Sequence, residues 1–128
     1  MKKIINKKLS DLSFEVTQNS STEPAFSGEY YSNKREGLYN CICCDENLFH
    51  SNDKYDSGSG WPSFTKAIND SKIRLIEDNS FGMKRVEVKC FNCDSHLGHV
   101  FDDGPKPDGK RYCINSVSLN FVCKNGEL

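Results

Sequence analysis

Two CxxC motifs lie far apart in this chain and constrain its fold more than any other feature. Cys41 and Cys44 form one pair, and Cys90 and Cys93 form the other. A two-residue spacing lets a pair of thiolates bind one tetrahedral ion, and four soft sulfur ligands favour zinc in a closed, structural site. We therefore expect one structural zinc ion that ties the two segments together, and its binding free energy adds to the folding free energy.

The cysteine pairs have other interpretations. A redox CxxC of the thioredoxin type would follow a strand in a βαβ unit, and neither copy has that setting. A catalytic zinc needs an open coordination position, which four thiolates do not leave. Cys43 offers the metal an alternative ligand, but Cys41 and Cys44 have the better loop geometry.

Composition limits the class of protein. The chain has 128 residues, so we expect a single domain over 1-128. Its apolar content of 36% is low for a hydrophobic core that is not stabilised by a covalent or metal cross-link. The formal net charge of -1 gives no long-range field to gather nucleic acid or anionic lipid. The lysines near the start precede no apolar run of signal-peptide length, and no segment approaches membrane-spanning length. Together with an odd number of cysteines, this favours a cytoplasmic protein, and we expect a monomer.

Hydrophobic periodicity predicts one helix and one hairpin. Leu9, Leu12 and Val16 recur at spacings of three and four, which fits a short helix on the core. Residues 73–75 and 86–88 alternate apolar and charged side chains, which is typical of strands. The segment Asp78-Asn79-Ser80-Phe81-Gly82 between them has the residues of a turn, so we expect an antiparallel pair.

A second hairpin is expected between residues 99–101 and 111–113, because Asp103-Gly104-Pro105 and Pro107-Asp108-Gly109 supply turn residues between them. This hairpin would bring His99 towards Cys113. If the strand continued from Cys113 as far as Phe121, the odd positions would share one side.

Outside the four paired cysteines, Cys113 has the best setting for thiol chemistry. Arg111 is a basic neighbour, and the hairpin predicts a nearby histidine. His96 and His99 flank Gly98, which makes a helix unfavourable and lets both imidazoles face one site.

Asn115 lies two residues beyond Cys113, where its amide could orient a histidine or a water. Trp61 is the only tryptophan and lies among turn residues, where it lines a pocket or packs in the core. The residues alone also allow a purely structural interpretation, because isolated cysteines and histidines in strands are often buried core residues with no catalytic role.

These residues carry a resemblance to a known family, the B-type methionine sulfoxide reductases, which are specific for the R epimer. The likeness runs from about Val16 to Phe121. It is carried by Thr22-Glu23-Pro24, Tyr39 to Cys44, Leu48-Phe49, Ser57 to Phe64, His96 to Phe101 with Asp103-Gly104-Pro105, and Arg111 to Ser116.

The resemblance implies a fold and a set of roles. The fold is mainly β, with two packed antiparallel sheets and short N-terminal helices, stapled by a zinc site of four cysteines. Cys113 is the nucleophile that attacks the sulfoxide sulfur, releases methionine and becomes a sulfenic acid. A thiol reductant such as thioredoxin then restores it. The remaining roles fall to His96, His99 and Asn115 as the active-site hydrogen-bonding group, Trp61 against the sulfoxide methyl, and Cys41, Cys44, Cys90 and Cys93 as zinc ligands.

One departure concerns the second step. Many family members carry a resolving cysteine where this chain has Ser59, and serine forms no disulfide. Cys43 and Cys123 are the other candidates, but neither satisfies disulfide geometry from the sequence, so we expect direct reduction by an external thiol. Two rival functions are a non-catalytic zinc-binding β module and a cysteine and histidine hydrolase, and the hydrolase requires an oxyanion hole that no motif supplies.

Overall fold

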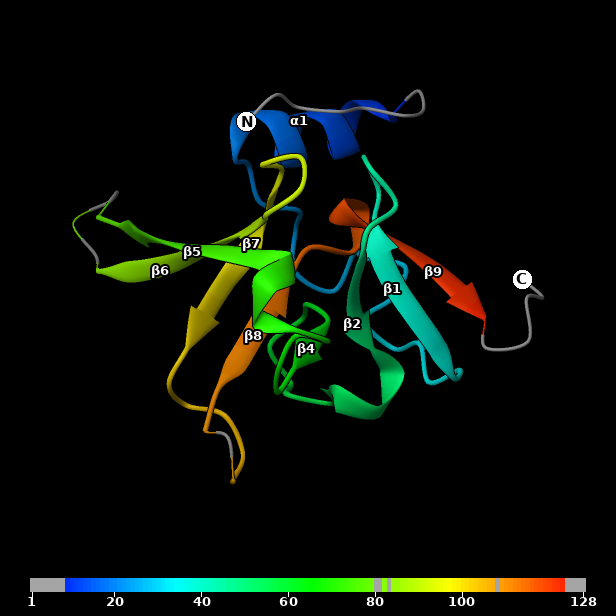
Figure 1. The fold of residues 1–128 in the computed structure, drawn as a ribbon, viewed down its shortest axis with the longest axis vertical. Helices are drawn as coiled ribbons and strands as arrows, with labels where there is room; N and C mark the ends of the chain where they lie inside the picture. Colours follow the sequence, from blue (N-terminus) through cyan, green and yellow to red (C-terminus); the bar gives the residue numbers. More distant parts are fainter. Residues whose placement is uncertain (1–8, 80–81, 83, 108, 124–128) are drawn as a thin grey trace.

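The computed structural model describes residues 9–79, 82, 84–107 and 109–123. These residues form two antiparallel sheets, with strand orders β2-β1-β9 and β3-β4-β8-β7-β6-β5, and one α-helix above them (Figure 1). The expected fold class is confirmed. The elements in chain order are α1 (Asp11–Asn19), β1 (Gly37–Cys41), β2 (Asn47–His50), η1 (Ser51–Asp53), β3 (Lys54–Tyr55), β4 (Ser63–Phe64), η2 (Asp70–Lys72), β5 (Ile73–Asp78), β6 (Arg85–Cys90), β7 (His96–Phe101), β8 (Arg111–Ile114), η4 (Ser116–Ser118) and β9 (Leu119–Cys123).

Both expected hairpins are present. β5 pairs with β6 from Ile73 opposite Cys90 to Asp78 opposite Arg85. β7 pairs with β8, and His99 lies directly opposite Cys113. The expected turn residues 80, 81 and 108 lie outside the described residues.

An aromatic core joins the two sheets. Phe49 of β2 stacks on Phe64 of β4 with ring centroids 4.5 Å apart. Tyr39 of β1 lies 5.1 Å from the Phe64 ring and 4.9 Å from the Phe121 ring of β9. All four rings are buried. Because close aromatic pairs contribute beyond their buried area, this cluster fixes how one sheet lies on the other.

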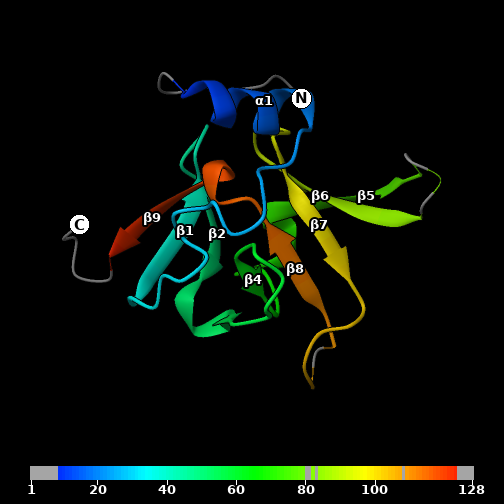
Figure 2. The same ribbon diagram turned by 180° about the vertical axis from the view of Figure 1, so that it is seen from behind.

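The helix α1 forms where the apolar spacing predicts it, and the two views show it lying across the ends of both sheets (Figures 1 and 2). Ser10 caps its first turn by accepting from the Ser13 N–H at 3.1 Å. Val16 is fully buried, whereas Leu12 is largely exposed. The Ser13 hydroxyl donates to the Val117 carbonyl at 2.8 Å, so the helix is anchored to η4.

The continuous strand considered from Cys113 to Phe121 is not formed. β8 ends at Ile114, Asn115 begins a 3-10 turn, and β9 then pairs with β1 of the other sheet. The turn closes through the Ser118 N–H, which donates to the Asn115 carbonyl at 3.0 Å. As a result Cys123 lies in the other sheet from Cys113.

None of the helices in the described residues is long and apolar enough to cross a membrane.

Candidate functional site

Two matching loops present the paired cysteines. The Asp45 N–H donates to the Cys41 carbonyl at 2.9 Å, and the Asp94 N–H donates to the Cys90 carbonyl at 2.8 Å. Both aspartates have a left-handed backbone, with φ of 66° and 65°. Aspartate tolerates this conformation better than most residues, so each CxxC-Asp segment folds into the same turn.

The two loops bring four sulfurs together. The Sγ atoms of Cys41, Cys44, Cys90 and Cys93 all lie within 4.8 Å of one another, and the Cys41–Cys93 and Cys44–Cys90 pairs are both 3.6 Å apart. Sulfurs bound to one tetrahedral zinc at about 2.3 Å are separated by about 3.8 Å, so the arrangement fits such an ion. The cluster could therefore hold a metal, and it would join β1 of one sheet to β6 of the other.

Hydrogen bonding within the cluster divides the protons unevenly, because it raises the pKa of Cys41 and lowers the pKa values of the other three thiols. A hydrogen bond from Cys41 lowers the pKa of Cys90 to about 5 and that of Cys93 to about 6. Cys43 is buried beside the cluster but is not one of its four members. Its sulfur accepts from the Gln18 side chain at 3.6 Å, which connects α1 to this region.

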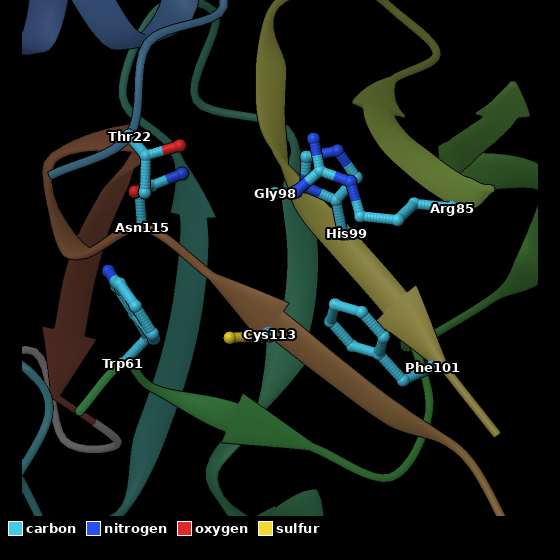
Figure 3. Close-up of a pocket in the computed structure, with 8 residues that line it drawn as sticks. All are labelled: Thr22, Trp61, Arg85, Gly98, His99, Phe101, Cys113 and Asn115. Carbon is cyan, nitrogen blue, oxygen red and sulfur yellow. The ribbon is translucent and has the colours of Figure 1, made fainter. Parts of the chain in front are cut away.

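A second site is a small pocket of about 90 Å³ around Cys113. Figure 3 shows the Cys113 sulfur pointing towards Trp61, with Asn115 and Thr22 above it and with His99, Arg85 and Phe101 on the other side. Typical pockets for whole ligands are about 300 Å³ or more, so this one admits only the end of a side chain. Its lining residues are Thr22, Trp61, Arg85, Gly98, His99, Phe101, Cys113 and Asn115.

Strand register places His99 beside Cys113. Residues directly opposite each other in antiparallel strands have Cβ atoms about 5 Å apart on the same face. Gly98 permits the close approach, because a Cβ there would lie 2.0 Å from the Cys113 carbonyl oxygen. His96 and His99 have ring centroids 5.5 Å apart, but His96 is buried and does not line the pocket.

Carboxylates from the neighbouring strands hold the two histidines, and the sequence analysis did not single them out. Asp78 Oδ2 lies 2.8 Å from His99 Nε2 and 3.3 Å from Arg85 Nη2. Glu87 Oε2 lies 2.7 Å from His96 Nδ1. Burial lowers the pKa of His96, with Glu87 opposing the shift. The predicted hairpin of β5 and β6 could have identified Asp78, because its register places Asp78 opposite Arg85.

Cys113 is shielded from solvent more than the sequence indicated. Burial raises the pKa of its thiol, and Arg111 only partly opposes that effect. The Arg111 guanidinium is already paired with Asp103, through contacts of 2.9 and 3.1 Å. Burial therefore favours the neutral thiol over the thiolate at this position.

Glu23 is a third residue to which the sequence analysis gave no role, although its segment carried part of the family resemblance. Its carbonyl accepts from the Trp61 indole N–H at 2.9 Å, and its N–H donates to Asn115 Oδ1 at 2.9 Å. The Asn115 amide also donates to the Leu97 carbonyl at 2.9 Å. Both ends of the Asn115 side chain are thus bound to the backbone, and both Trp61 and Asn115 are fixed through one segment of the pocket wall.

Comparisons with known proteins agree with this geometry. The family model described as the SelR domain matches residues 9–123. The chain is 56% identical over 124 residues, covering 96% of this chain and 90% of each relative, to the proteins named peptide methionine sulfoxide reductase MsrB of Escherichia coli strains K12 DH10B, SE11 and 55989. The chain therefore belongs to the SelR family, that of the B-type methionine sulfoxide reductases which its sequence resembles.

Proposed function

We propose that this protein is a peptide-methionine (R)-S-oxide reductase whose nucleophile is Cys113. The observation that carries the proposal is the juxtaposition of Cys113, His99 and Trp61 around one small pocket in a SelR-family chain. The R preference follows the activity of the B-type enzymes.

The first step transfers oxygen from the substrate to Cys113. The Cys113 sulfur attacks the sulfoxide sulfur and forms a sulfur–sulfur bond with it. That bond and the substrate sulfur–oxygen bond then break as the oxygen bonds to the Cys113 sulfur, which leaves methionine and a cysteine sulfenic acid. Because burial raises the Cys113 pKa, the thiol proton is given up as the substrate oxygen takes up a proton. His99 is placed to carry that proton, and Asp78 holds its ring through Nε2.

Trp61 forms the wall against which the sulfoxide methyl packs. Its indole N–H is bound to the Glu23 carbonyl, so the ring cannot turn freely in the pocket. A rigid aromatic wall favours one placement of a methyl group next to a polar sulfoxide oxygen. Exchange of the two groups would put the oxygen against the ring, which gives a physical basis for epimer selection.

We place the regeneration step outside the chain. Ser59 accepts a hydrogen bond from the Ser57 hydroxyl at 2.8 Å and offers no sulfur. Cys43 is fully buried beside the four-cysteine cluster, and Cys123 lies in the other sheet. A thiol such as thioredoxin would attack the sulfenic acid, release water and form a mixed disulfide, which a second thiol resolves.

The four-cysteine cluster would hold one structural Zn²⁺. The supporting observations are its all-thiol donor set and its sulfur separations. A reductase that depends on free thiols requires a reducing compartment, which supports the cytoplasm. We also propose that it acts as a monomer.

An epimer assay tests the function. With dithiothreitol, the protein should reduce a peptide containing the R sulfoxide and not its S epimer. Cys113→Ser should abolish turnover without unfolding the chain, and His99→Ala should lower kcat by roughly 10²-fold or more. Turnover of the S epimer alone would refute the proposed specificity, and turnover of neither epimer would favour another function such as a non-catalytic zinc-binding β module.

A further inference from the structure

Phe26 combines two features that folding alone does not favour. Its side chain is 66% exposed, and its backbone is left-handed with φ of 65°. A bulky residue in this region is an outlier, and such a conformation costs about 1–3 kcal/mol. Because the ring is exposed, burial of its apolar surface offsets little of that cost.

The other left-handed residues have structural explanations. Among the described residues, the non-glycine positions with positive φ are Ser20, Phe26, Asp45 and Asp94. Ser20 ends α1, with its N–H donating to the Glu15 carbonyl. The two aspartates form the cysteine loops described above. Phe26 lies at the third position of a turn that the Ser27 N–H closes on the Pro24 carbonyl at 3.2 Å, where a positive φ normally falls to glycine or asparagine and not to a bulky ring.

Contacts with the pocket wall hold Phe26 in place. Its N–H donates to the Gly60 carbonyl at 2.7 Å. Its ring lies against Gly60, where a Cβ would come 3.0 Å from two ring atoms. Tyr31 packs edge-on against the same ring, with centroids 5.3 Å apart and planes at 82°. Since Gly60 immediately precedes Trp61, this aromatic pair lies next to the substrate wall.

The pocket is too small to enclose more than the end of one side chain. The rest of a substrate must therefore lie outside it, where it meets the surface around the opening. Thr22 of the pocket lining and Phe26 belong to one short segment, so this surface continues from the pocket. Phe26 is exposed there, and the half-buried Tyr31 packs against it; we name this pair the aromatic shelf.

We propose that the aromatic shelf binds an apolar side chain that neighbours the oxidised methionine in a polypeptide. It makes the protein prefer sulfoxides in apolar, unfolded segments over sulfoxides with polar neighbours. This inference rests on the proposed function. It explains why an aromatic ring stays exposed in an unfavourable backbone conformation.

Paired substrates test the shelf. We would measure kcat/KM for two R-sulfoxide pentapeptides that differ only in having leucine or serine on both sides of the sulfoxide. The wild-type chain should favour the leucine peptide by roughly tenfold, which corresponds to burying about 50 Å² of apolar surface. Phe26→Ala and Phe26→Gly should each reduce that ratio to about one.

Control variants distinguish an effect of the Phe26 ring on substrate preference from an effect on the fold. Phe14→Ala removes another exposed phenylalanine, on α1, and should leave the ratio unchanged. Phe26→Gly should melt at the same temperature as Phe26→Ala or higher, because glycine adopts positive φ without strain. A wild-type ratio near one, or Phe26 variants that keep the wild-type ratio, would overturn the shelf. Failure of the wild type on both peptides would instead overturn the proposed function.

Discussion

Removing the proposed zinc ion from the four-cysteine cluster should destabilise the protein strongly. The cluster joins Cys44 to Cys90 and Cys41 to Cys93, which are 46 and 52 positions apart. In a chain-entropy model, one cross-link closing about 46 residues restricts the unfolded state by about 4 kcal/mol at 25 °C. Whole domains are stable by about 5–15 kcal/mol, so loss of this cross-link alone removes much of the stability.

Thermal melting measures the effect. For a chain of 128 residues, the entropy of unfolding near the midpoint is about 0.27 kcal/mol/K, so a loss of about 4 kcal/mol lowers the midpoint by about 15 °C. We would add a zinc chelator in excess, record near-UV circular dichroism, and quantify the released metal. An unchanged midpoint after release of one metal per chain would refute the structural role.

A variant of Cys43 provides the matched control. Cys43 is buried beside the cluster but lies outside its four members. Cys43→Ala should therefore still bind one metal per chain. Loss of the metal in this variant would show that the fifth cysteine is a ligand.

Three further substitutions test the residues around the pocket. Asp78→Asn should lower kcat by roughly tenfold or more with little change in KM, and Asp78→Glu should keep more activity, since Asp78 positions His99. Asn115→Ala should lower the free energy of unfolding by about 1–2 kcal/mol, measured by urea titration, because it leaves the buried Glu23 N–H without its acceptor and removes one of the two donors to the Leu97 carbonyl. Burial raises the pKa of Glu23, so ionisation of its carboxyl lowers stability as pH rises through that raised pKa. Urea titrations of Glu23→Gln should therefore show its stability relative to wild type increasing from about pH 4 to about pH 7, and a constant difference would refute this.

Local patterns in the sequence predicted the parts of the fold that depend on short spacings. The CxxC pairs identified the four sulfurs that the structure brings together. Alternating side chains and turn residues predicted the two hairpins, and the second placed His99 opposite Cys113. These features depend on neighbours in the chain or on strand periodicity.

The features that sequence reasoning missed depend on long-range contacts. β8 ends at Ile114 because the following turn is tied to the segment around Glu23, whose carboxylate accepts from the Val117 N–H at 3.0 Å. Periodicity contains no information about that partner, and an alternating pattern continues through the break. The position of Phe26 beside Trp61 likewise depends on its long-range hydrogen bond to Gly60.

The role of Asn115 shows a related limit. Its position two residues after Cys113 suggested an amide directed at a histidine or water. In the structure its two ends bind backbone groups of Leu97 and Glu23. Spacing placed the residue at the pocket, but only the packed structure shows what its side chain contacts.

A single-turnover experiment tests the central claim that Cys113 takes the sulfoxide oxygen without help from another cysteine. The reduced protein is mixed with one equivalent of R-sulfoxide peptide in the absence of reductant, trapped with dimedone, and mapped by mass spectrometry. We predict one methionine formed per chain and a dimedone adduct on Cys113. A stoichiometric disulfide between Cys113 and Cys43 or Cys123, or an adduct on a different cysteine, would contradict the account.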